Sequence, residues 1–142
     1  MSAFSRIHKD VSVEDHGKWL SSAIQDDKNK YFMIVYGSSS IGFCSLRNID
    51  CISKTAELQI KLGVSSYRGI GLGTKSVERL LSKAWREFQL NKVYLYVFSD
   101  NLRAKAVYSK LGFSLEGKLK KHLYVDHQYK DLEIMSIFKE IH

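Results

Sequence analysis

Three alternate glycines, at positions 69, 71 and 73, lie between a strand-like apolar run that ends near Leu62 and an amphipathic stretch that begins near Thr74. Because glycine has no Cβ atom, several backbone N–H groups in such a turn can converge on one anion. The dipole of the following helix adds positive potential at the same point. The segment therefore predicts a strand–turn–helix unit that binds a phosphate group, with a pyrophosphate as the candidate ligand. The alternative is that the glycines only make a tight turn.

Two common nucleotide-binding loops do not fit this segment. A P-loop closes with Gly-Lys-Ser/Thr, but Gly73 is followed by Thr-Lys-Ser, which puts the lysine and the hydroxyl out of register. A dinucleotide-binding fingerprint spaces its glycines as G-x-G-x-x-G, whereas these are spaced G-x-G-x-G. In addition, no acidic residue closes a strand at the distance that a ribose contact needs. Both loops are therefore excluded.

Apolar periodicity predicts an α+β fold with a mixed sheet. Strands are expected at residues 31–36, 41–46 and 55–62 as an antiparallel meander, at 92–97, and as a final hairpin over 114–138 that turns at 126–128. The helix after the glycine segment joins the third strand to the fourth. A crossover helix of this kind makes the two strands that it joins parallel.

Helices are expected in three places. The first follows a capping box, Ser-Val-Glu-Asp at residues 12–15, and carries an apolar stripe as far as residue 24. The second follows the glycine segment and has an apolar stripe of period 3.6 over residues 77–88. The third is capped by Asp100 or Asn101.

Composition is that of an ordinary globular domain. With 142 residues and 44% hydrophobic content, the chain fits a single domain, residues 1–142, with one core. It has neither an apolar run that could cross a bilayer nor a signal-peptide pattern, so we expect a cytoplasmic protein. Cys44 and Cys51 are expected to be free thiols, because no CxxC pair is present. The five histidines show no pair at metal-ligand spacing, so no metal site is predicted.

The net charge of +7 favours a polyanionic partner. Basic residues are dispersed along the chain, without a zinc-finger spacing, an RNP-like aromatic motif or a basic helix. The densest basic cluster, at residues 118–122, is interpreted as a solvated strand face, with a substrate-phosphate site as the alternative. A phosphorylated small molecule is therefore favoured over nucleic acid, and no membrane partner is expected.

Two spaced motifs resemble the cofactor-binding segments of the GCN5-related N-acetyltransferases, the GNAT family. Residues 68–73 match the pattern Arg-x-x-Gly-x-Gly of the family's acyl-CoA pyrophosphate loop. Residues 101–113 read Asn-x-x-Ala-x-x-x-Tyr-x-x-x-Gly-Phe and resemble its second cofactor-contacting segment. Over residues 55–138 the chain resembles the subgroup that includes spermidine, ribosomal-protein N-terminal and nucleotide-amino-sugar N-acetyltransferases.

The resemblance implies a set of acetyl-CoA contacts. In the family, the third strand splays from its parallel neighbour, and its backbone N–H groups meet the pantetheine and the thioester, where they could also act as oxyanion donors. The residues so implied are Lys61, Leu62, Gly63, Arg68, Gly69, Ile70, Gly71, Leu72, Gly73, Thr74 and Asn101.

The resemblance also implies catalytic roles. Tyr108 lies on the same helical stripe as Asn101, and its counterpart in the family protonates the departing CoA thiolate. Without the resemblance, such a tyrosine would be interpreted as a core residue with its hydroxyl at the rim. Glu57 on the third strand is the candidate general base, although an outward-facing glutamate paired with a lysine is an equal alternative. Asp131 or Glu133 on the last hairpin could take the same role.

One departure from the family is expected in the fold. Family members begin with an extra strand and helix before the capping-box helix, and few residues precede residue 12 here. We therefore expect a GNAT-like fold that lacks the first strand and helix, either as a naturally short form or as a truncated reading. Such a loss would leave a sheet edge to be covered, paired or tolerated.

These features predict an acetyl-CoA-dependent N-acetyltransferase that works by direct attack of a primary amine in a ternary complex. The chain has 22 basic against 15 acidic residues, which favours an anionic acceptor such as a nucleotide-linked amino sugar over a polyamine. A protein N-terminus is the next alternative. A catalytically idle CoA-binding module is the alternative from another class. The sequence does not identify the oligomeric state, and a homodimer is the candidate assembly because dimers are common among relatives.

Overall fold

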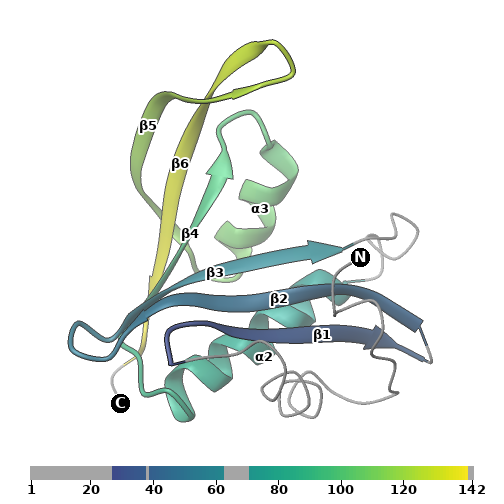
Figure 1. Ribbon diagram of the computed structural model, residues 1–142, viewed down its shortest axis with the longest axis vertical. Helices are drawn as coiled ribbons and strands as arrows, with labels where there is room; N and C mark the ends of the chain where they lie inside the picture. The colour runs from purple at the N-terminus through teal and green to yellow at the C-terminus, as the bar shows by residue number, and fades with distance from the viewer. Residues whose placement is uncertain (1–26, 38, 63–70, 141–142) are drawn as a thin grey trace.

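The computed structural model of this protein describes residues 27–37, 39–62 and 71–140. In these residues it has one six-stranded sheet, with strand order β1-β2-β3-β4-β6-β5, and two helices (Figure 1). The elements are β1 (Lys30–Tyr36), β2 (Ser39–Asp50), β3 (Thr55–Leu62), α2 (Leu72–Arg86), β4 (Lys92–Phe98), α3 (Leu102–Lys110), β5 (Ser114–Val125) and β6 (Gln128–Phe138). Parallel and antiparallel pairs both occur, so the predicted α+β class with a mixed sheet is confirmed.

The first three strands form the expected antiparallel meander. Gly37 makes the first turn with a φ of 63°, a left-handed conformation that glycine adopts at little cost. β2 is longer than expected, because it begins at Ser39 and the mostly polar residues after Leu46 continue the strand to Asp50. Asp50 Oδ1 then accepts hydrogen bonds from the backbone N–H groups of Ile52 and Ser53, each at 2.9 Å. The carboxylate thus closes the turn into β3.

β3 and β4 are parallel, as the crossover helix predicted, but they pair at only three positions. The last pair is Glu57 with Tyr94, and β3 then continues to Leu62 without a partner on β4. Figure 1 shows the two strands diverging, so that β1 to β3 form one half of the sheet and β4, β6 and β5 the other. The edge of β3 that this divergence leaves unpaired is central to the candidate site.

α2 covers one face of the first half of the sheet (Figure 1). Its buried residues follow the predicted stripe and are Ser76, Val77, Leu80, Leu81 and Ala84. The apolar members of this stripe pack in one cluster with strand residues such as Leu58 and Val93. Because successive strand residues point to opposite faces, Glu57 and Tyr94 lie on the face away from α2.

α3 has no fully buried residue. A partly buried aromatic side chain and a lysine connect it to the rest of the fold. Tyr108 packs partly against the main core. Lys105 Nζ donates to Glu133 Oε2 on β6 at 2.9 Å and to the backbone carbonyl of Ser99 at 3.2 Å. Glu133 is only 6% exposed, so this ion pair is a partly desolvated link between α3 and β6.

The predicted final hairpin is present. β5 and β6 pair antiparallel around Asp126 and His127, whose φ values of 52° and 63° suit a two-residue turn between twisted strands. β5 is an edge strand, and its basic residues at 118 and 120–122 are exposed. This exposure supports the interpretation of the basic cluster as a solvated strand face.

Other expectations have mixed outcomes. The helix expected at residues 12–24 lies outside the described residues. The expected loss of the first strand and helix concerns the same part of the chain and stays a prediction. Cys44 is buried and Cys51 is exposed, and both are free thiols as predicted. No helix in the described part of the chain is long and apolar enough to span a membrane.

Candidate functional site

Two cavities meet where β3 leaves β4. The first, the helix cavity, has a volume of about 370 Å³ and lies among the start of α2, the start of α3 and β3. The second, the strand cavity, has a volume of about 440 Å³ and lies among β2, β3 and β4. Ile60, Lys61 and Tyr108 line both cavities. The two cavities therefore adjoin, with Tyr108 at their junction.

The start of α2 forms one wall of the helix cavity. Gly71 is the N-cap with φ 79° and ψ 11°, and no side chain caps the helix or places a negative charge in its first turn. Within the helix itself, therefore, no side chain neutralises the first N–H groups of α2 or its positive dipole end. Gly73 and Thr74 also line this cavity. The helix begins at Leu72, slightly before the expected start at Thr74.

Glycine at position 71 is favoured by the backbone conformation and not by close packing around it. A Cβ atom added there would meet no atom within 4 Å, whereas the left-handed φ is one that other residues adopt at a cost. The other predicted cofactor residues of this turn, at positions 68 to 70, lie outside the described residues together with Gly63.

The start of α3 forms the opposite wall of the helix cavity. Asn101, one of the two expected caps, is the N-cap, and its Oδ1 accepts a hydrogen bond from the backbone N–H of Ala104 at 3.1 Å. The amide nitrogen of Asn101 takes no part in this bond and can donate to a ligand. Arg103 also lines this cavity, although the sequence analysis gave it no role. Its position inside the Asn-x-x-Ala motif was the signal that could have identified it.

Tyr108 is half-buried and lies against Phe113, with ring centroids 5.7 Å apart and an interplanar angle of 63°. Burial raises the pKa of the Tyr108 phenol above its ordinary value of 10.0, because the phenolate would lose solvation. The phenol therefore keeps its proton at neutral pH. It is placed between the two cavities as a group that can donate a proton.

Glu57 lines the strand cavity, on the sheet face away from α2. Its Oε1 accepts a hydrogen bond from Asn48 Nδ2 at 3.3 Å. In the described part of the chain no ion pair joins Glu57 to a lysine. The alternative interpretation, in which Glu57 points outward and pairs with a lysine, is therefore not supported. Phe43 and Tyr96 line the same cavity and were not among the residues predicted from the sequence.

The alternative bases lie elsewhere. Asp131 Oδ1 accepts a hydrogen bond from the backbone N–H of Lys121 at 2.7 Å, and Asp131 Oδ2 lies 3.7 Å from Lys118 Nζ. Glu133 is bound to Lys105, whose ammonium group lowers the pKa of that carboxyl. Neither carboxylate lines the helix cavity or the strand cavity. Of the three carboxylates considered from the sequence, Glu57 is the one that lines either cavity.

Two of the predicted cofactor residues, Lys61 and Leu62, lie on β3 beyond its last pair with β4. Beyond Glu57, β3 pairs with β2 on one side and has no β4 partner on the other, which leaves backbone groups on that edge free for a ligand. Lys61 lines both cavities, and Leu62 is the last residue of the strand.

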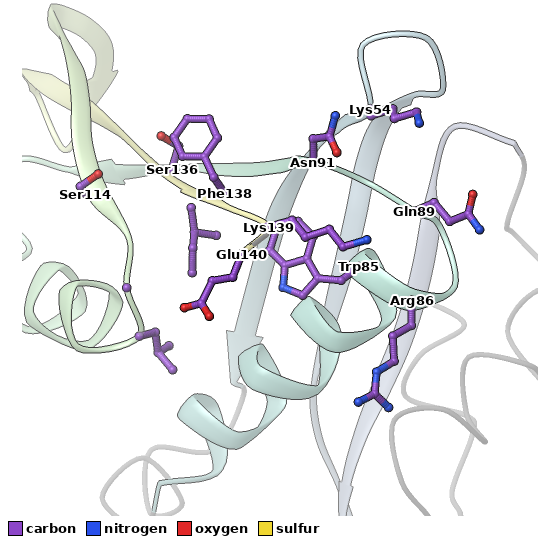
Figure 2. Close-up of a pocket in the computed structure, with 13 residues that line it drawn as sticks. Lys54, Trp85, Arg86, Gln89, Asn91, Ser114, Ser136, Phe138, Lys139 and Glu140 are labelled. Atoms are coloured by element: carbon purple, nitrogen blue, oxygen red, sulfur yellow. The ribbon is translucent and has the colours of Figure 1, made fainter. Parts of the chain in front are cut away.

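A third cavity of the described part of the chain is larger than these two. It has a volume of about 1050 Å³ and lies among the C-terminal end of α2, the segment that leads into β4, and the end of β6 (Figure 2). Trp85, Arg86 and Phe138 are among its lining residues. It shares no residue with the helix cavity or the strand cavity. Size alone therefore does not identify the candidate site.

Comparison with known proteins agrees with this geometry. Residues 2–114 match the model of the acetyltransferase (GNAT) domain family. The chain belongs to this family. It is 31% identical over 116 residues to spermidine N(1)-acetyltransferase of Escherichia coli K12, an alignment that covers 82% of this chain and 62% of that protein. It is also 31% identical over 106 residues to a putative ribosomal N-acetyltransferase, YdaF, of Bacillus subtilis. This alignment covers 75% of this chain and 57% of that protein.

Among solved structures, a mutant of spermidine N-acetyltransferase SpeG from Vibrio cholerae superposes with a TM-score of 0.77 at 26% identity. The match covers 89% of this chain and 75% of that one. The predicted GNAT-like fold and the suspected subgroup are thus confirmed. The chain spans less than two thirds of the length of the two curated relatives above, 62% and 57%.

Proposed function

We propose that this GNAT protein is an acetyl-CoA-dependent N-acetyltransferase that acts on a primary amine by direct attack in a ternary complex. The observation that carries the proposal is the junction of the two cavities at Tyr108, beside the unpaired edge of β3. One cavity begins at an uncapped helix N-terminus, where a pyrophosphate is stabilised. The other contains a carboxylate that can accept a proton from an amine.

The chain's own residues can hold the cosubstrate along this path. Gly71, Gly73 and Thr74 would meet the pyrophosphate, together with the turn residues 68 to 70 that the family resemblance implies. The unpaired edge of β3, at Lys61 and Leu62, would meet the pantetheine arm and the thioester carbonyl. Acetyl-CoA supplies a thioester that an amine nitrogen can attack.

Each proton in the reaction has a candidate group. The acceptor arrives as an ammonium ion, and Glu57 accepts one proton so that the nitrogen lone pair can attack the carbonyl carbon. As the C–N bond forms, the C–S bond breaks, and Tyr108 donates its proton to the leaving thiolate. Backbone N–H groups on the edge of β3 would stabilise the negative charge on the carbonyl oxygen.

The charges around the cavities favour an acceptor with a single amine and an anionic part. Of the described residues that line the strand cavity, Glu57 is the carboxylate and Lys61 is the cation. Arg103 adds a second cation in the adjoining helix cavity. A polyamine carries several ammonium groups and would favour several carboxylates. A nucleotide-linked amino sugar is therefore the first candidate. A polyamine is the second, because the relatives above include spermidine acetyltransferases.

The test is release of CoA thiol from acetyl-CoA in the presence of a nucleotide-linked amino sugar, spermidine and a short peptide with a free N-terminus. We expect thiol release above background with one of these classes, and loss of most of it in Tyr108→Phe. If the protein binds acetyl-CoA but no amine raises thiol release, the chain is a CoA-binding module and the enzymatic proposal is wrong.

A further inference from the structure

Glu57, Tyr94 and Tyr96 gather on one face of the sheet at the point where β3 and β4 separate. β4 alternates, with Val93 and Leu95 buried on the α2 side and Tyr94 and Tyr96 on the opposite side. Glu57 faces the same side, because it is the register partner of Tyr94. The catalytic scheme above uses Glu57 but leaves the two tyrosines without a role.

The two rings are in edge-to-face contact, with centroids 6.1 Å apart and an interplanar angle of 88°. An edge-to-face pair leaves ring surface open to other contacts. Tyr96 is 44% exposed and lines the strand cavity together with Glu57, whereas Tyr94 is not among the lining residues. Tyr96 therefore offers an aromatic surface to a ligand in the strand cavity. Tyr94 packs against the Tyr96 ring from outside the cavity lining.

The electrostatics of the cluster suit a cation. Burial, and then the nearby Glu57 carboxylate, raise the pKa of Tyr94 above 10.0, so this phenol is neutral at pH 7. Aromatic faces attract cations through their quadrupole, and a nearby carboxylate adds to this attraction. Arg47 lies opposite Glu57 on β2 but does not line the strand cavity. Lys61 is the cation that does line it.

We propose that Tyr96 and Glu57 together recognise the reactive amine of the acceptor as an alkylammonium ion, with Tyr96 as a residue that determines specificity. This inference rests on the proposed function and narrows its substrate class. An alkylamine is protonated at neutral pH and binds to the cluster as a cation, after which Glu57 takes the proton. An aromatic amine or an alcohol is uncharged at that pH and lacks this attraction.

Kinetics of Tyr96 variants test the proposal. Tyr96→Leu removes the ring and is expected to raise the KM for the amine about 3- to 30-fold, the range that corresponds to a cation–π contact, with little change in the KM for acetyl-CoA. Tyr96→Phe keeps the ring and should restore most of the amine affinity. Tyr124→Leu is the matched control, because Tyr124 is also an exposed strand tyrosine, at 62%, and lies outside both cavities.

A pair of probes tests charge directly, without turnover. Choline carries a quaternary ammonium ion, and 3,3-dimethylbutan-1-ol is its uncharged counterpart of the same shape. In ligand-observed NMR with the whole protein, choline should give a saturation-transfer signal that Tyr96→Leu weakens, and the neutral alcohol should give a much smaller signal.

The outcomes separate the two proposals. Equal signals from both probes, or an unchanged amine KM and choline signal in Tyr96→Leu, would overturn the recognition proposal. If no amine releases CoA but choline still binds through Tyr96, the enzymatic proposal fails and the cation site stands. Circular dichroism of each variant shows whether it is folded, and the comparison of choline with the neutral alcohol on the wild-type protein still tests the proposal if Tyr96→Leu is not.

Discussion

Glu57 on β3 lies directly opposite Tyr94 on β4, and this is the last pair before the two strands separate. The pair therefore marks the boundary between closed sheet and open edge. Beyond it, the open edge of β3 lies between the helix cavity, at the start of α2, and the strand cavity, which Glu57 and Tyr96 line. Tyr108 lines both cavities. The proposed reaction between a bound thioester and an amine needs the two cavities to adjoin, and they adjoin where the strands diverge.

Replacement of Tyr108 tests the proposed general acid. Tyr108→Phe removes the phenol hydroxyl but keeps the ring that packs against Phe113. Loss of general acid catalysis costs roughly 100-fold or more, so kcat should fall by about that factor. The dissociation constant of acetyl-CoA, measured by calorimetry, should change less than about twofold, because the hydroxyl acts at the leaving sulfur. An unchanged kcat would remove Tyr108 from this role.

The pKa of Tyr108 gives a prediction for alkaline pH. Because burial raises this pKa above 10.0, the phenol keeps its proton through neutral and mildly alkaline solution, and kcat should show no loss from its ionisation below pH 10.0. Above pH 10.0 the unfolded chain ionises this tyrosine first, so the free energy of unfolding should decrease as pH rises toward the raised pKa. The profiles of kcat and of unfolding against pH, recorded for wild type and Tyr108→Phe, check both statements. A fall in kcat near pH 8 that disappears in the variant would contradict them.

Gly71 and Gly117 provide a matched pair for the phosphate site. Gly71→Ala places a side chain at a φ of 79°, which costs about 1–2 kcal/mol and displaces the turn ahead of α2. We expect the Kd of acetyl-CoA to rise about tenfold. Gly117→Ala is the control, because its added Cβ would also meet nothing within 4 Å, and Gly117 is not among the glycines with positive φ. Equal effects of the two changes on acetyl-CoA binding would argue against the site.

The ion pair between Lys105 and Glu133 should matter for the position of α3. Lys105→Met leaves the nearly buried Glu133 carboxylate without this partner, so the thermal midpoint should fall by a few degrees. The comparison is Lys130→Met, which breaks an ion pair with the 65% exposed side chain of Asp100 and should change the midpoint little. Thermal melts followed by circular dichroism measure both. A larger effect of Lys130→Met would show that the link at Lys105 does not anchor α3.

Acid pH should weaken the same link. Lys105 lowers the pKa of Glu133 below its ordinary value of 4.5, so the link stabilises the fold above pH 4.5. This contribution is lost as pH falls from 4.5 through the lowered pKa, because the folded state then takes up the proton that the unfolded chain already holds. Unfolding curves between pH 3 and pH 6 should show a smaller pH dependence in Glu133→Gln than in wild type.

Local features of the fold could be predicted from the sequence because local physics decides them. The stripe of α2, the cap at Asn101 and the turn at Asp126 each depend on residues close in the chain, and the structure has all three. β2 was predicted too short, because its second part is polar and its end depends on the side chain of Asp50.

The divergence of β3 from β4 could not be derived from periodicity and entered only through the family resemblance. Whether two parallel strands stay paired depends on what packs between them, and that is a long-range property. Tyr96 and Arg103 were missed for a related reason. Arg103 lies within a cofactor motif and Tyr96 lies on a predicted strand. Whether their side chains line a cavity depends on elements that are distant in the chain.

The central claim is that acetyl-CoA binds along the junction between the two halves of the sheet. A crystal structure of the protein with acetyl-CoA tests it most directly. We predict that the diphosphate lies at the N-terminus of α2, beside Gly71 and Gly73, and that the thioester reaches the cavity junction at Tyr108. A diphosphate bound elsewhere, for example in the large cavity beside Trp85, would contradict the account.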